Sequence, residues 1–203
     1  IRARMTAGFA SVLLLMVILT AEGVREVNMI DHSMKVINDV NSVKQQYAVD
    51  YRGSVHDRSV ALRDVALIND DAKLEPVIAD IRRLAGNYRE AAAGMQELFA
   101  SRDDITAEER SGLADIQAIE AKTMPLIDKV IELRQAGDTD AAERVLLDQA
   151  APAFTAWLNT INAFIDLQEQ LNEAETGFAR NIAENFEITM LALCSRRRVG
   201  GIK

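Results

Sequence analysis

The sequence predicts an all-α fold, an antiparallel up-down-up-down four-helix bundle, from three observations. Helix breakers are scarce, because the 203 residues include 10 glycines and 3 prolines. Apolar residues recur every three to four positions over four long stretches, which is the period of an amphipathic helix. Capping and turn residues separate these stretches, and short connections favour antiparallel neighbours.

The first helix is expected over residues 24–68, where the sequence contains no proline and one glycine. We expect it to continue directly from the apolar run that precedes it. Asn69-Asp70-Asp71 then predicts a turn and the N-cap of a second helix. The second helix has a seam in heptad register, formed by Val77, Ile81, Leu84, Tyr88, Ala91, Met95 and Leu98.

Residues 101–104 end the second helix, and Thr106 with Glu109 predicts a capping box at the start of the third. Pro125 predicts a bend inside the third helix. Gly137 is the expected C-cap, followed by Asp138 or Thr139 as the next N-cap. The fourth helix is expected to be interrupted or kinked near Pro152 and to run to the end of the chain.

The N-terminal residues 7–21 form an uncharged apolar run behind Arg2 and Arg4. At about 15 residues it lies between a signal-peptide core and the roughly 20 residues that cross a bilayer. With its neighbours, residues 1–23 are interpreted as a complete or partial first transmembrane segment, with the N-terminus in the cytoplasm. A cleaved signal peptide and the end of a buried core helix are the alternatives.

The C-terminal residues 188–203 begin with seven residues like the opening of a second apolar segment and continue into three arginines. We interpret them as the start of a truncated second transmembrane segment plus a non-native tail; a basic stop-transfer sequence is the alternative. Residues 24–187 would then form the bundle, with the first and fourth helices extended toward the membrane.

Composition excludes several functions. The net charge of −8 disfavours nucleic acid, whose phosphates require a basic surface. The two histidines are far apart, no Glu-x-x-His pair exists and Cys194 is the one cysteine, so neither a di-iron site nor covalent haem is expected. Without a nucleophile with its base or a glycine-rich phosphate loop, we expect no cofactor, no metal and no enzyme.

A polar layer is predicted inside the bundle. Counting from the predicted turns places Arg58, Tyr88, Thr123 and Thr155 at about 15–24 Å, roughly one level. Arg58 is in helical phase with Tyr51, and a buried guanidinium requires an anion. That anion is either a neighbouring carboxylate such as Glu120 or a ligand lined by these residues, unless Arg58 reaches solvent along its stem.

A second basic face of the first helix carries Arg52, His56, Ser59 and Arg63 at positions i, i+4, i+7 and i+11. It is either a solvated face or a surface that meets a second subunit, where an anion would bridge two copies of the helix.

Four segments carry a resemblance to a known family: residues 2–21, and the phrases RGSVHDRSVALRDVAL, QAGDTDAAERVLLDQAAPAF and NEAETGFARNIAENFEITML. With them the chain resembles the extracytoplasmic sensing domain of bacterial methyl-accepting chemotaxis proteins of the four-helix-bundle type. The resemblance implies a homodimer whose first helices pack together, although other oligomers stay open. It also implies a location in the bacterial inner membrane, contacted by both termini, with the sensing domain in the periplasm.

The resemblance further implies that Arg52, Arg58 and Arg63 bind ligand carboxylates and that residues 152–155 add contacts. Their arginine spacing departs from the aspartate-sensing relatives, and Ala153 and Phe154 offer no hydroxyl. We therefore expect a di- or tricarboxylate such as malate or citrate, with an aromatic acid or an amino acid as alternatives. The fourth helix would transmit the signal. A structural membrane-tethered bundle, or the same sensing fold on a histidine kinase, is the alternative function.

Overall fold

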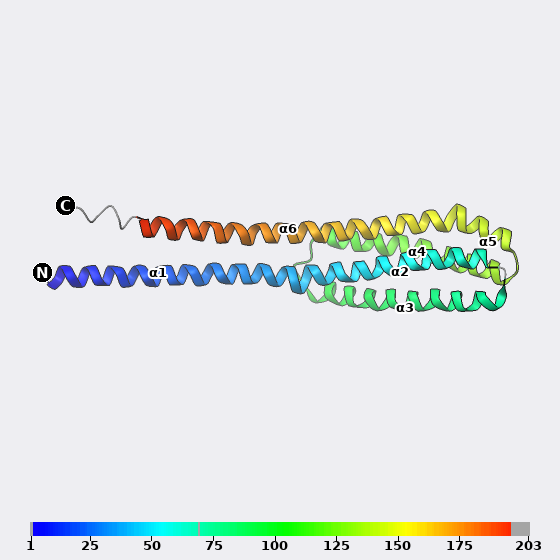
Figure 1. The fold of residues 1–203 in the computed structure, drawn as a ribbon, viewed down its shortest axis with the longest axis horizontal. Helices are drawn as coiled ribbons and strands as arrows, with labels where there is room; N and C mark the ends of the chain where they lie inside the picture. The colour runs from blue at the N-terminus through cyan, green and yellow to red at the C-terminus, as the bar shows by residue number, and fades with distance from the viewer. Residues whose placement is uncertain (1, 69, 196–203) are drawn as a thin grey trace. The chain divides into compact units, whose positions relative to one another are not determined.

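The computed structural model describes residues 2–68 and 70–195, and this part of the chain is built from helices alone, which confirms the all-α prediction (Figure 1). It divides into two compact units. The four-helix unit comprises Ser42–Gln170, and the two-helix unit comprises Ile1–Asn41 with Leu171–Lys203.

The first helical stretch consists of α1 (Arg2–Lys35), a π-helical segment η1 (Val36–Asn41) and α2 (Ser42–Leu67). Its continuity with the apolar run was predicted, whereas the π-helical segment was not. Within Met5–Leu67 lies an apolar window long enough to cross a membrane. Its apolar side chains, among them Met5, Phe9 and Leu14, are exposed, as expected of a surface that meets lipid or another protein.

The helix α3 (Asp71–Ser101) begins at the predicted N-cap, where Asp70 Oδ1 accepts a hydrogen bond of 3.1 Å from the Ala72 N–H. The helix α4 (Ala107–Gln135) begins at the predicted capping box: the Glu109 N–H donates to Thr106 Oγ1, and the Thr106 N–H donates to Glu109 Oε2. Pro125 lies inside α4. Both predicted starts are confirmed.

The end of α4 is a Schellman motif. The Gly137 N–H donates to the Arg134 carbonyl at 3.1 Å, and the Asp138 N–H donates to the Leu133 carbonyl at 2.9 Å. Gly137 has a φ of +82°, in the left-handed region that favours glycine. Asp138 is the next N-cap, because its side chain accepts from the Ala141 N–H. The predicted turn is therefore confirmed, with Ala136 as the C-cap and Gly137 one residue beyond it.

The fourth helical stretch consists of α5 (Thr139–Val145), a π-helical segment η2 (Leu146–Ala150) and α6 (Ala151–Ser195). The interruption predicted near Pro152 is thus η2, which ends two residues before the proline. Residues 188–195 belong to α6, while residues 196–203 lie outside the described residues, so the interpretation of 188–203 as a truncated membrane segment and tail stays a prediction.

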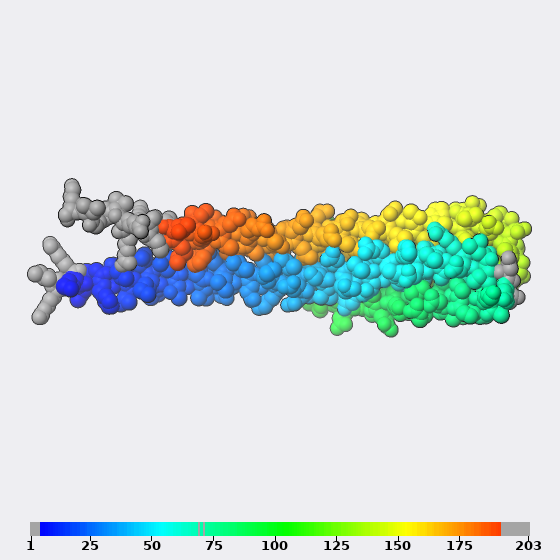
Figure 2. All heavy atoms as spheres, in the orientation of Figure 1, coloured from blue at the N-terminus to red at the C-terminus, as the bar shows by residue number. Residues whose placement is uncertain are grey.

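The core of the four-helix unit lies between α2, α3, α4 and α5–η2–α6, and the space-filling view shows one outer face of this unit (Figure 2). A row of aromatic rings crosses it. Tyr51 stacks on Tyr88 with ring centroids 4.5 Å apart, Tyr88 meets the edge of Trp157 at 5.3 Å, and Trp157 stacks on Phe154 at 6.3 Å. This row of rings lies at the level along the bundle where the polar layer was predicted.

In the two-helix unit, α1 carries a shallow apolar pocket of about 600 Å³ with Phe178 of α6. It is lined by Ala21, Val24, Arg25, Asn28, Met29, His32 and Phe178.

Candidate functional site

Arg58 is the central residue of the candidate site, since its side chain lies in the core with 1% of its surface exposed. Its Nε donates to the Ser54 carbonyl at 3.3 Å, and Nη1 contacts Met124 Sδ at 3.3 Å. The Nη2 atom is buried and has no hydrogen-bond partner among the residues that the structure describes. Because an unsatisfied buried charge is costly, this guanidinium has unused capacity for an acceptor.

Two aromatic rings enclose the guanidinium. Its central carbon lies 4.9 Å from the ring centroid of Trp157 and 5.1 Å from that of Tyr88. Such cation–π contacts are strongest in desolvated surroundings. Burial lowers the pKa of Arg58, against the influence of Tyr88 and Glu120, which raise it. An arginine nonetheless stays charged in proteins, so the site presents a cation at neutral pH.

Glu120 lies near this cation without forming an ion pair with it in the described part of the chain. Burial raises the pKa of Glu120, opposed by a hydrogen bond from Tyr88 and by the charge of Arg58. The Glu120 carboxylate therefore stabilises the charged form of Arg58 without a direct ion pair. The direct Glu120–Arg58 pair, which was one of the alternatives predicted from the sequence, is not formed among the described residues.

A groove of about 290 Å³ runs beside Arg58 between α2, α3 and α4. Its walls are partly apolar, and they also carry a second arginine and two carboxylates. The residues that line it are Arg58, Ile81, Arg82, Ala85, Met124, Ile127, Asp128, Ile131, Glu132 and Gln135. The groove therefore offers cationic, anionic and apolar groups to a small molecule.

The structure brings together Arg58, Tyr51 and Tyr88 of the predicted site. Thr123 is buried, but its hydroxyl donates to the Ile119 carbonyl of its own helix at 2.8 Å. Thr155 is exposed, and its hydroxyl donates to the Ala151 carbonyl at 3.0 Å. The two threonine hydroxyls are therefore already engaged with backbone carbonyls.

The second basic face is exposed at its three charged or titratable residues, whereas Ser59 is buried and its hydroxyl donates to the His56 carbonyl at 2.7 Å. Arg52, His56 and Arg63 all lie outside the core, and His56 Nδ1 is 3.1 Å from Asp57 Oδ1. These three side chains are not brought together with Arg58.

Two residues around Arg58 were missed as site residues, Trp157 and Met124. Trp157 belonged to the apolar stripe of the fourth helix, and the signal that could have identified it was its level beside Tyr88 in the same layer.

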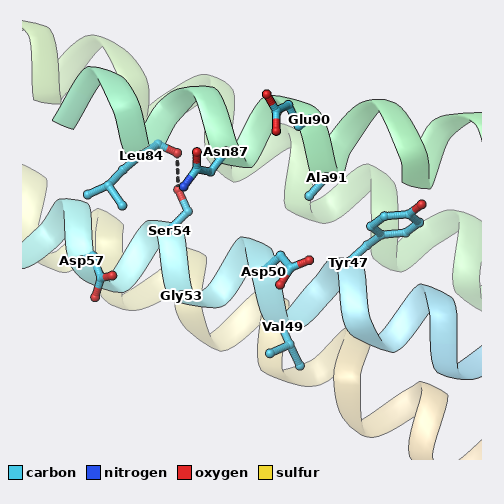
Figure 3. A pocket seen from close by; sticks show the side chains of 10 residues that line it. All are labelled: Tyr47, Val49, Asp50, Gly53, Ser54, Asp57, Leu84, Asn87, Glu90 and Ala91. Atoms are coloured by element: carbon cyan, nitrogen blue, oxygen red, sulfur yellow. Dashed lines mark hydrogen bonds between the residues drawn. The ribbon is translucent and has the colours of Figure 1, made fainter. Parts of the chain in front are cut away.

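A larger groove of about 630 Å³ lies between α2 and α3 (Figure 3). Ser54 spans it by donating to the Leu84 carbonyl at 2.7 Å. Its lining includes the carboxylates Asp50, Asp57 and Glu90 and no basic residue. An organic anion would be repelled there, so this groove is not the candidate carboxylate site.

A separate buried ionic cluster, formed by Lys44, Glu109 and Gln168, joins α2, α4 and α6. Their exposed fractions are 2%, 1% and 0%. Glu109 Oε1 accepts from Lys44 Nζ and, at 3.0 Å, from Gln168 Nε2. Burial alone would raise the pKa of Glu109, but the hydrogen bonds from Lys44, Thr106 and Gln168 together lower it. This cluster was not among the features predicted from the sequence.

Among the described residues, no group of three or more histidine, cysteine or carboxylate side chains is arranged to hold a metal ion.

Comparison with known proteins gives one family. The model of a four helix bundle sensory module for signal transduction matches residues 1–182. A search of curated proteins finds no match. Modules of this family are not normally catalytic, and they are extracytoplasmic parts of membrane receptors. The apolar stretch near the N-terminus of this chain agrees with a place on a membrane receptor. The match covers most of the chain and agrees with the helical fold, and the chain therefore belongs to the four-helix-bundle sensory modules of methyl-accepting chemotaxis proteins.

Proposed function

We propose that this module senses a small organic acid whose carboxylate binds Arg58. The observation that carries the proposal is a buried guanidinium with an unpartnered Nη2, in the wall of a groove and without an ion pair in the described structure. A ligand carboxylate would supply the missing acceptor through a charge-assisted hydrogen bond.

A di- or tricarboxylate such as malate or citrate is the first candidate ligand. Arg82 is an exposed second cation in the lining of the same groove, so a second carboxylate has a partner available. The body of such a ligand would lie against Ala85 and Ile81.

An amino acid or an aromatic acid is the second candidate. Asp128 and Glu132 line the same groove and would attract an ammonium group while repelling a third carboxylate. Met124, Ile127 and Ile131 supply an apolar wall for an aromatic ring or an aliphatic side chain.

Signal transmission through α6 is supported by the contact between Arg58 and Trp157, which belongs to α6. A carboxylate that draws the guanidinium toward the groove weakens this contact. The ligand thereby stabilises one position of α6 more than another, which is the requirement for shifting a two-state equilibrium. We also propose that the receptor is a homodimer in the bacterial inner membrane with this module in the periplasm.

The test is calorimetric titration of the chain with malate, citrate, benzoate and leucine, with thermal unfolding as a second readout. A ligand that binds the folded state raises the unfolding midpoint with its concentration. Arg58→Met should remove the response, whereas Arg52→Met, a matched change on the exposed face of the same helix, should leave it. The reverse pattern would place the site on the outer face, and no response to any acid would favour a structural bundle.

Salt provides an independent check, because ion pairs in a partly buried site are screened less than exposed ones. Affinity should fall only modestly between about 0.05 and 0.5 M salt; a steep fall would point to the exposed arginines instead.

A further inference from the structure

We propose that the buried ionic cluster Lys44–Glu109–Gln168 is a latch that sets the axial register of α6 against α2 and α4, and that Gln168 is its releasable arm. This inference goes beyond ligand binding and depends neither on Arg58 nor on the identity of the acid.

The fixed part of the latch is Glu109. Its Oε1 atom accepts from Lys44 and Gln168, and its Oε2 atom accepts from the Thr106 N–H at 2.8 Å and the Thr106 hydroxyl at 3.0 Å. Both carboxylate oxygens are therefore saturated. Because the contacts with Thr106 are also the capping box of α4, the carboxylate cannot follow another helix without unwinding the start of its own.

The second fixed part is Lys44, the third residue of α2. Its ammonium is buried against Glu109, with side-chain exposures of 3% and 1%. Separating two such charges leaves both buried and unpaired, so α2 and α4 are held together strongly at this level.

The arm on α6 is weaker. Gln168 donates one hydrogen bond of 3.0 Å from Nε2 to Glu109, and its buried Oε1 atom has no hydrogen-bond partner in residues 2–68 and 70–195. Beside this α6–α4 bond, an exposed hydrogen bond of 3.0 Å from Gln45 Nε2 to Glu169 Oε1 ties α2 to α6. Gln168 and Glu169 are consecutive residues of α6, and Lys44 and Gln45 are consecutive residues of α2, so both hydrogen bonds lie at one level.

An axial shift of α6 therefore breaks a small, defined set of bonds. A displacement of one residue, about 1.5 Å, lengthens a 3.0 Å hydrogen bond to roughly 3.4 Å when the bond lies across the helix axis, and further when it lies along the axis, beyond the usual range of about 2.7–3.2 Å. The Lys44–Glu109 pair and the capping box do not include α6 and stay intact. The Gln168 hydrogen bond can therefore form or break as α6 moves, while α2 and α4 keep their own contacts. This property makes the latch a two-state element and not only a core contact.

Spin-label distance measurements on the whole chain in detergent test this. The background is Cys194→Ser, with labels at the exposed positions 118 on α4 and 166 on α6. Gln168→Leu keeps the volume of the side chain and removes the bond; Gln170→Leu, at an exposed position two residues away, is the matched control.

With Gln168→Leu, the α4–α6 distance distribution should gain a second population, with the ratio of the two positions changed about tenfold or more, as expected for a hydrogen bond to a charged group. The control should match the parent. An unchanged, single distribution in a destabilised Gln168→Leu protein would show that the cluster is merely structural and would overturn the latch.

A second variant covers the case in which Gln168→Leu fails to fold. Glu169→Ala removes the exposed tie without touching the core, and it should shift the same distribution in the same direction by a smaller amount. Identical distributions for Glu169→Ala and the parent would then also overturn the proposal. Since none of these measurements includes a ligand, they fail or succeed separately from the carboxylate site.

Discussion

Replacing Lys44 by methionine should destabilise the four-helix unit far more than an ordinary loss of an ion pair. The lysine lies with 3% of its side chain exposed against Glu109 with 1% exposed. Methionine fills much of the lysine stem's volume, so the change removes the charge and leaves the carboxylate buried. Breaking a buried pair in this way costs about 3–5 kcal/mol.

The remaining contacts of Glu109 set the expected value within that range. The carboxylate keeps its hydrogen bonds from Gln168 and from the N–H and hydroxyl of Thr106. Because these continue to satisfy the oxygens, we expect the lower end, about 3 kcal/mol. The free energy of unfolding is measured by urea denaturation at pH 7, followed by far-UV circular dichroism, with the slope checked for two-state behaviour.

Two further proteins make this measurement decisive. Lys35→Met breaks an exposed i,i+4 pair with Asp31, with side-chain exposures of 65% and 59%, and should lower the free energy of unfolding far less than Lys44→Met does, because water and salt screen an exposed pair. Lys44→Met combined with Glu109→Gln leaves no buried charge in the pair and should recover at least half of the loss. A cost for Lys44→Met as small as that of Lys35→Met would refute the reasoning.

Acid should weaken the fold partly through Glu109, whose pKa is lowered in the folded state from 4.5: its contribution is present above pH 4.5 and is lost as pH falls below it. The free energy of unfolding, measured by urea denaturation at several pH values, should therefore decrease less steeply toward acid pH for Glu109→Gln than for the parent; equal slopes would contradict this. Gly137→Ala should lower the free energy of unfolding by about 1 kcal/mol, because φ is +82° there; a stabilised variant in thermal unfolding would refute it. Thr106→Ala should cost about 1 kcal/mol or more, by the same assay, through the lost cap.

The ends of the helices were predictable because capping chemistry is local. Asp70, the Thr106–Glu109 box and Gly137 each satisfy or permit a backbone conformation set by their immediate neighbours. The two π-helical segments were not predictable, since one extra residue in a turn leaves the apolar period of the flanking helices almost unchanged.

The burial of Arg58 was predictable from its helical phase, because Arg58 lies seven residues, about two helical turns, after the buried Tyr51. The level of Thr155 was counted along a regular helix, and that count did not include η2. In the structure Phe154 and Trp157 are the buried residues of that turn, and Thr155 is exposed.

The buried ionic cluster was missed for a different reason. Lys44 is four residues from Val40 and from Ala48, and Gln168 is seven residues from Ile161, so both share the phase of their apolar stripes. Long polar side chains in such positions often reach solvent, and one helix alone does not show otherwise. The signal that could have predicted the cluster was the presence of a cation, an anion and an amide on the inward faces of three different helices.

The enclosure of Arg58 has a practical consequence for optical work on this receptor module. The chain contains a single tryptophan, and that indole lies 4.9 Å from the guanidinium. Its emission colour and intensity depend on the charge beside the ring, so any occupant that withdraws the cation should alter the intrinsic fluorescence of the unlabelled protein. Trp157 is therefore an intrinsic fluorescent probe of acid binding beside Arg58.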